Sequence, residues 1–186
     1  MTLFEYITIA SSLILSFGVA RLVSGIPELV RSDKRYWLHL LWVFGLLANY
    51  PLMFWQMWNY RVVENWQFFS FLLVIATPCA CLLTAHFLIP TNPREDTDWE
   101  QHYYDNRRGI FGSLVFASFF TLYSTFVLLD VEADNPSRIL GVGSIAFLLI
   151  LAWSGSKKVH VGMTVGMGVI ASLMFIAYRL PGSLLS

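Results

Sequence analysis

Charged residues are scarce in this sequence, and their scarcity excludes most soluble folds. Only 13% of the 186 residues are Asp, Glu, Lys or Arg, whereas 56% are hydrophobic. Soluble domains carry about a quarter of their residues as charged side chains. Apolar runs of roughly 20 residues, which a bilayer requires and a soluble core does not, recur along the chain. The composition therefore predicts a polytopic membrane protein in which residues 1–186 form one all-α integral membrane domain.

Motifs for catalysis are also absent. The sequence has no GxSxG, no HExxH and no glycine-rich phosphate loop, and no pair of Asp or Glu lies within an apolar run. Cysteine occurs only twice, at Cys79 and Cys81. A helix points residues two apart about 200° from each other, so we expect neither a disulfide nor chelation, but two small core residues. These absences argue against catalytic residues and against binding of nucleic acid.

Six hydrophobic segments are present, and we expect each to be a transmembrane helix. Proline and glycine mark several of their ends, as "GIP" does after the first, "PTNP" after the third and "PG" after the sixth. The first lacks the basic start of a signal peptide, so it is expected to stay as a helix. The fifth is the shortest, and at about 1.5 Å per residue it barely crosses a bilayer core. The expected spans are about 3–25, 36–60, 66–89, 109–130, 138–153 and 159–179.

Lys and Arg are distributed unevenly among the connections between these segments. The connections after the first, third and fifth segments hold eight of them, and the remaining connections and ends hold three. Such residues accumulate on the cytoplasmic side of membrane proteins. We therefore expect these three connections to be cytoplasmic and both termini to lie on the outer side. Trp99 and Tyr103, in the long third connection, are expected to dip into the membrane interface.

This orientation places several candidate ligand residues near the cytoplasmic side. Arg21, His39 and His86 fall at the inner ends of the first three segments, and Arg107 and Arg108 precede the fourth, where they would suit lipid phosphates. Arg21 has two interpretations. Its long side chain could snorkel to the headgroups. Alternatively, it could face the bundle interior beside the two histidines and bind an anionic group.

The histidines show no spacing typical of a metal site, since His39, His86 and His160 lie on three different segments. A bis-histidine haem would need two of them to face each other across the bundle. We expect instead interfacial histidines that bond to backbone or headgroups, and neither a metal nor a cofactor.

Polar side chains recur at helical spacing within the segments, and each stripe could either pack helices together or line a polar cavity. Asn49 favours a cavity, as does Gln56, because an amide at mid-depth is costly without partners. Pro51 and Pro78 free backbone carbonyls that can line such a cavity. The stripes are Glu5, Thr8, Ser12 and Ser16; His39, Trp42, Asn49 and Gln56; Ser70, Thr77, Cys81 and Thr84; and Ser113, Thr121, Ser124 and Thr125.

Several fragments together resemble a group of small bacterial integral membrane proteins. They are "ARLVSG", "WLHLLW", "WQFFSFLL" and "HYYDNRRGIFG", spread over residues 16–112. The resemblance implies a bacterial inner-membrane protein with the same helices and carries no known activity. It points to the cytoplasmic-side residues Arg21, His39, Trp42, Pro90, His102, Arg107 and Arg108.

The sequence therefore predicts a non-enzymatic, channel- or transporter-like protein of the bacterial inner membrane. Its cytoplasm-facing polar cavity would bind or pass a small anionic species or a lipid headgroup, and anionic lipid is a possible partner. Gly162 and Gly166 form a GxxxG that could join copies into a homo-oligomer. Two alternatives remain: a structural or signalling subunit of a membrane complex, and a membrane enzyme acting on lipid. The expected ligand-binding residues are Arg21, His39, Asn49, His86, Arg107 and Arg108.

Overall fold

The structure is a computed structural model that describes residues 2–91, 97–129 and 136–179, with side chains except those of 136–138 and 170–179. Every regular element within these ranges is helical, which confirms the all-α prediction for this part of the chain. The elements are α1 (Leu3–Arg31), α2 (Trp37–Met57), the 3-10 helix η1 (Trp58–Val62), α3 (Phe68–Leu88), α4 (Trp99–Leu129), α5 (Pro136–Trp153) and α6 (Lys157–Arg179).

In the part of the chain that the structure describes, four stretches of helix are long and apolar enough to cross a membrane. They are α1, α2 continued by η1, α3 and α4, and the apolar part of α5, Ile139–Trp153, is shorter. Together these helices indicate a membrane protein. Six crossings, with both termini outside, stay a prediction.

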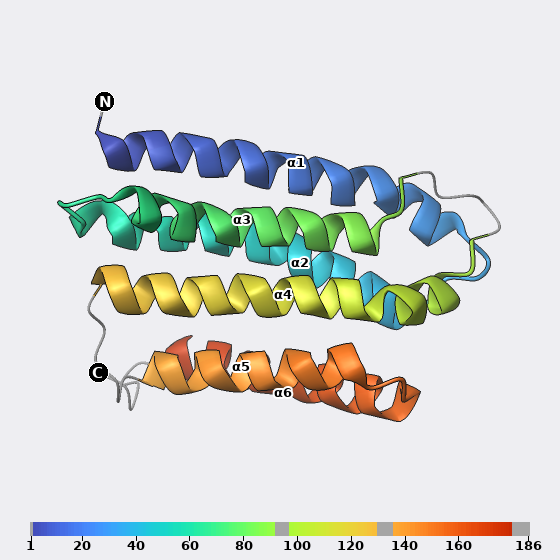
Figure 1. The fold of residues 1–186 in the computed structure, drawn as a ribbon. Helices are drawn as coiled ribbons and strands as arrows, with labels where there is room; N and C mark the ends of the chain where they lie inside the picture. The colour runs from blue at the N-terminus through green and yellow to red at the C-terminus, as the bar shows by residue number, and fades with distance from the viewer. Residues whose placement is uncertain (1, 92–96, 130–135, 180–186) are drawn as a thin grey trace. The chain divides into compact units, whose positions relative to one another are not determined.

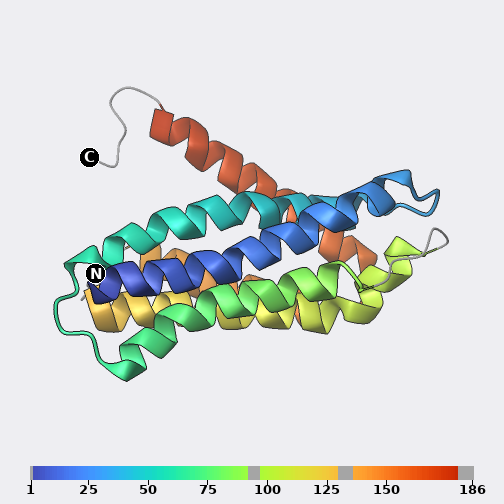
Figure 2. The same cartoon turned by 90° about the horizontal axis from the view of Figure 1, so that it is seen from above.

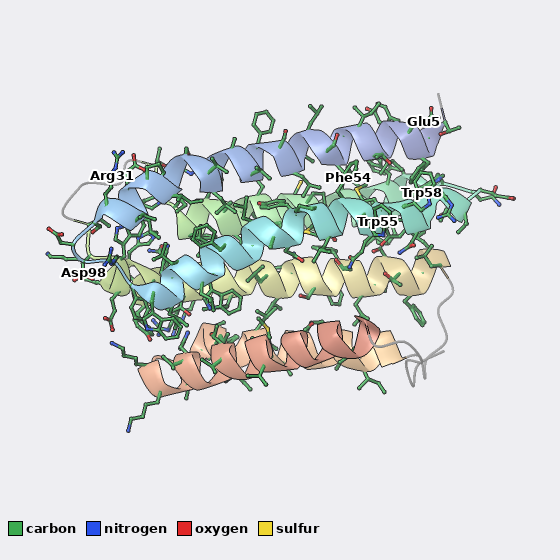
Figure 3. The ribbon with its side chains drawn as sticks, turned by 180° about the vertical axis from the view of Figure 1, so that it is seen from behind. Glu5, Arg31, Phe54, Trp55, Trp58 and Asp98 are labelled. Carbon is green, nitrogen blue, oxygen red and sulfur yellow. The ribbon has the colours of Figure 1, made fainter. Side chains whose placement is uncertain are left out.

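The chain divides into two compact units, Met1–Trp153 with α1 to α5 and Ser154–Ser186 with α6. In the first unit, α1, α3, α4 and α5 lie in a row, and α2 packs across one side of that row (Figures 1 and 2). Successive helices of this unit run in opposite directions. The C-termini of α1 and α3 therefore meet the N-termini of α2 and α4 at one end, which we call the basic end after Arg31, Lys34 and Arg35. Arg31 and Asp98 lie there, and Glu5 lies at the opposite end (Figure 3).

The first helix runs to Arg31 rather than ending before "GIP", so its expected end at residue 25 is wrong. Pro27 lies inside α1, on its exposed side. Proline removes one backbone donor and crowds the preceding turn. The helix continues because the residues on either side hold it in place: the backbone of Gly25 packs against the Ile89 side chain, and Leu29 is fully buried.

The fourth helix begins at Trp99 rather than at residue 109. Asp98 caps it, since its Oδ1 accepts a hydrogen bond from the Gln101 backbone N–H at 3.0 Å. The prediction that Trp99 and Tyr103 lie in the membrane interface is wrong, because both are fully buried. About one helical turn separates them, so both lie on the same face of α4, against His39 of α2. The sequence carried the signal as an acid followed three residues later by Gln, a common helix start.

The buried face of α1 is a stripe that repeats every three or four residues, and it packs chiefly on α3. The stripe comprises Ile7, Ser11, Leu15, Gly18, Leu22, Gly25 and Leu29. The polar stripe expected on this helix lies outside it. Its hydroxyls bond to carbonyls of their own helix, as Ser12 does to Ile9 and Ser16 to Leu13. Hydroxyls satisfied in this way need no partner helix.

Candidate functional site

A cavity of about 790 Å³ lies beneath α2, over α3 and α4, and reaches α5. We call it the polar pocket. Its size suits a small-molecule ligand, for which pockets of roughly 300–1,000 Å³ are usual. Each helix contributes one face to it, at spacings of three and four residues. The lining includes Asn49, Met53 and Gln56 of α2, Val74, Thr77, Pro78 and Cys81 of α3, Ser118, Thr121 and Thr125 of α4, and Gly141 and Ser144 of α5.

The pocket exists because α2 stands off from the row of helices. At the basic end, large rings from α2 fill the gap, with Trp42 edge-on to Phe111 at a centroid distance of 4.9 Å. One turn after Leu46, the α2 side chains change to Asn49, Met53 and Gln56, and the space beneath them stays open. Pro78 lies in the lining, and its missing N–H leaves the carbonyl one turn earlier in α3, at Val74, without its helical donor.

The chemistry of the lining is polar without being ionic. Three amides, those of Asn49, Gln56 and Asn59, share it with the hydroxyls of α3, α4 and α5. Among the residues that the structure describes, no Asp, Glu, Lys, Arg or His lines the pocket. The described lining therefore offers hydrogen-bond donors and acceptors and no charged group.

Hydroxyl pairs join α3, α4 and η1 alongside the pocket. Thr84 and Ser113 lie 2.7 Å apart at their oxygens, and Thr77 and Thr121 lie 3.3 Å apart. Near the opposite end, the Tyr60 hydroxyl lies 2.7 Å from that of Ser124. The stripes of α3 and α4 thus pack helices together, and Thr77 and Thr121 also face the pocket.

Tyr50 ties α2 to α1 and α3 beside the pocket. Its hydroxyl donates to the Cys81 carbonyl at 3.0 Å, and its ring lies where a side chain at Gly18 would otherwise stand. The Cys81 thiol is buried and contacts the Met53 sulfur at 3.5 Å. Both cysteines are free, but Cys79 is exposed, so its expected place in the core is wrong. The two point in different directions, as their spacing requires.

A second polar cluster surrounds the C-terminus of α3, where backbone carbonyls have no helical partner. Arg21 Nη2 donates to the Ile89 carbonyl at 2.9 Å, and His102 Nε2 lies 3.1 Å from the Phe87 carbonyl. Because Asn106 Nδ2 approaches His102 Nδ1 as a donor, the ring proton is on Nε2 and points at that carbonyl. The Leu88 carbonyl lies beside the ring of His39. Side chains from α1, α2 and α4 thus meet at one helix end.

His39 is fully buried in an aromatic cluster at this end. Its ring centroid lies 5.2 Å from that of Trp99, 5.7 Å from that of His102 and 6.0 Å from that of Tyr103. Neither ring nitrogen makes a hydrogen bond of good geometry with a described residue. At the edge of the cluster, the Tyr36 and Tyr104 hydroxyls lie 3.0 Å apart. Burial, and then this hydrogen bond, raise the pKa of Tyr36 above its ordinary value.

The candidate residues from the sequence fall into three places. Asn49 lines the polar pocket, while Arg21 and His39 gather at the C-terminus of α3. His86 is exposed, and Arg107 Nη1 donates to the Tyr104 carbonyl at 2.7 Å within α4. Arg108 is exposed on the far side of α4 from the pocket.

Three of the amide and serine side chains in the lining were not anticipated, namely Asn59, Ser118 and Ser144. Ser118 had a signal in the sequence, because it precedes Thr121 and Thr125 at spacings of three and four, which is one helical face. Asn59 had none, since it lies in η1, beyond the regular period of α2.

The apolar helices indicate a helical membrane protein, and the described residues form a polar pocket among them without a charged side chain. Comparison with known proteins returned no matching family model, no matching curated protein and no matching solved structure. Function is therefore inferred from the chemistry of the pocket itself.

Proposed function

We propose that this protein binds a small, uncharged molecule with several hydrogen-bonding groups in the polar pocket, and holds or passes it within the membrane. The observation that carries the proposal is the set of three amides in the lining. Asn49, Gln56 and Asn59 are exposed, and none makes a hydrogen bond with another described residue. In hydrocarbon, an unsatisfied polar group costs several kcal/mol. Water or a polar ligand must therefore meet these amides.

The pocket favours an uncharged ligand over the anionic one expected from the sequence. Arg21, the cation that suggested an anion, bonds to a carbonyl of α3 and does not belong to the lining. A charge moved from water into a site without a counter-charge carries a desolvation penalty that neutral hydrogen bonds repay poorly. An uncharged ligand with hydroxyl or amide groups can pair with both the donors and the acceptors of the lining.

The first prediction is that a thiol in the pocket reacts with uncharged polar reagents in preference to anionic ones. Ser118→Cys, placed in a Cys79→Ala, Cys81→Ala background, puts the only thiol in the pocket. We expect hydroxyethyl methanethiosulfonate to label it at least about tenfold faster than sulfonatoethyl methanethiosulfonate, relative to their rates with a free thiol. Labelling in membranes is followed by mass spectrometry of the intact protein. Asn49→Leu with Gln56→Leu should slow the uncharged reagent, since both amides are lost.

The matched control is Ser16→Cys in the same background. Ser16 of α1 lies at nearly the same depth as Ser118 of α4. Gly25 packs against Ile89 and so aligns α1 with α3, and the Thr77–Thr121 and Thr84–Ser113 pairs align α3 with α4. Ser16 is exposed outside the pocket, on a surface that lipid chains would cover. A thiol in hydrocarbon does not ionise to the reactive thiolate, so Ser16→Cys should react with neither reagent. If neither cysteine reacts, the proposal of an accessible polar pocket is contradicted. If the anionic reagent labels Ser118→Cys fast, the pocket accepts anions and the proposal of an uncharged ligand is contradicted.

A further inference from the structure

A second hollow, of about 470 Å³, lies between α3 and α4 on a different face of both helices from the polar pocket. We call it the α3–α4 groove. Small residues alternate in it with large apolar ones, and the backbone at Gly112 has open space where a side chain would stand. Its lining comprises Ala76, Cys79, Ala80, Leu83, Phe87, Arg108, Gly109, Gly112, Ser113, Phe116 and Phe120.

Arg108 is the single charged residue among the described residues of this lining. It is exposed, and it makes no hydrogen bond or ion pair with another described residue. It lies level with the last turn of α3, because the neighbouring Gly109 packs under the ring of Phe87. From Arg108 to Phe120 the groove follows α4 for twelve residues, or about 18 Å along the helix axis. A cation thus stands at one end of a long apolar groove, at the basic end of the bundle.

We propose that the α3–α4 groove is a binding site for an anionic phospholipid. The phosphate would pair with the planar, multiply donating guanidinium of Arg108, and one acyl chain would lie over Gly112 towards Phe120. Arg107, the next residue, bonds to the Tyr104 carbonyl instead, so the charge directed at the groove is that of Arg108.

The headgroup, rather than the acyl chain, provides the selectivity. Bulk lipid chains are as apolar as the groove, so transfer of a chain into it gains little. The Arg108 charge distinguishes lipids by net charge, and a zwitterionic choline headgroup would place a second cation beside it. The groove should therefore retain phosphatidylglycerol in preference to phosphatidylcholine.

Native mass spectrometry of the purified full chain, equilibrated in micelles with equal phosphatidylglycerol and phosphatidylcholine, tests this site. We expect wild type to retain phosphatidylglycerol, and Arg108→Gln to lower that retention by about fivefold, the factor for one cation near a membrane surface. Arg107→Gln removes the same charge one residue away and should keep most of the retention. Equal losses in the two variants would overturn the site.

A pair of glycine variants tests the groove itself. Gly112→Leu directs a side chain into the groove from a position where an added Cβ meets no neighbouring atom. We expect retention of phosphatidylglycerol to be lost while the helix content stays that of wild type. Gly143→Leu on α5 also projects into open space, outside the groove, and should retain the lipid. Unchanged retention in Gly112→Leu would overturn the proposal. The proposal would also be overturned if the wild-type protein were a dimer and Gly112→Leu a monomer, because a second copy of the chain would then occupy the groove.

Discussion

Arg21 shows how a lone cation is accommodated in an apolar helix. The last carbonyls of α3 form the negative end of a helix dipole, and in a low-dielectric region they require donors. Arg21 meets the Ile89 carbonyl, and His102 meets the Phe87 carbonyl. The sequence predicted that Arg21 and His39 share one end of the bundle, because alternating helix directions bring the end of the first helix to the start of the second, and both residues lie at the C-terminus of α3. It could not predict the partner, since a backbone carbonyl carries no residue signal.

At the residue scale, we expect Arg21→Met to lower the free energy of unfolding by about 1.5–3 kcal/mol, the range for a hydrogen bond that involves a charged group. Arg21→Lys should restore part of the loss, because an ammonium can still donate to one carbonyl. Equilibrium unfolding in mixed micelles with sodium dodecyl sulfate measures both. Arg31→Met, on the same helix but fully outside the α3 cap, serves as the control and should match wild type. If Arg21→Met also matches wild type, the side chain only snorkels.

At the scale of elements, glycine decides how closely α2 and the end of α3 approach α1. Tyr50 reaches the Cys81 carbonyl across the backbone of Gly18, and the Ile89 side chain packs on Gly25. The existence of the helices followed from apolar runs of the right length. Their ends were harder to predict, because Pro27 reads as a stop and α1 continues through it, held by packing that only the folded chain supplies. The "DWEQ" start of α4 was readable, but the charges around it resembled a solvated connection.

We therefore expect Gly18→Leu to destabilise the protein by about 1–3 kcal/mol, the usual effect of overpacking. The new side chain would displace the Tyr50 ring and break its hydrogen bond. Gly45→Leu is the matched control, because it makes the same substitution on α2 at a position where an added Cβ meets no neighbouring atom. Tyr50→Phe separates the two effects, since it removes the hydroxyl and leaves the ring. Unfolding in mixed micelles compares the three, and equal stability of the two leucine variants would contradict the close approach.

At the scale of the whole molecule, charge and polarity divide the first unit into two halves. The basic end carries the cap of α3, the aromatic cluster and Arg108, and the polar pocket lies towards the other end. Composition and charge predicted the membrane class and which residues share an end. They could not predict that Asn49 and Arg21 would lie in separate sites. That separation depends on the gap between α2 and the row of helices, and side-chain packing, rather than the spacing of polar residues along a helix, sets the size of this gap.

The last prediction concerns which way this unit faces. The basic end should face the cytoplasm, because Lys and Arg accumulate there. Asp33→Cys and Glu64→Cys, each in the Cys79→Ala, Cys81→Ala background, report the two ends with the same loss of one exposed carboxylate. A membrane-impermeant maleimide should label Glu64→Cys on intact cells and Asp33→Cys only in inverted vesicles, as mass spectrometry would show. The reverse labelling pattern would show that the basic end faces outwards. Arg108 would then meet the lipids of the outer leaflet, and the α3–α4 groove could bind an anionic phospholipid only if that leaflet contained one.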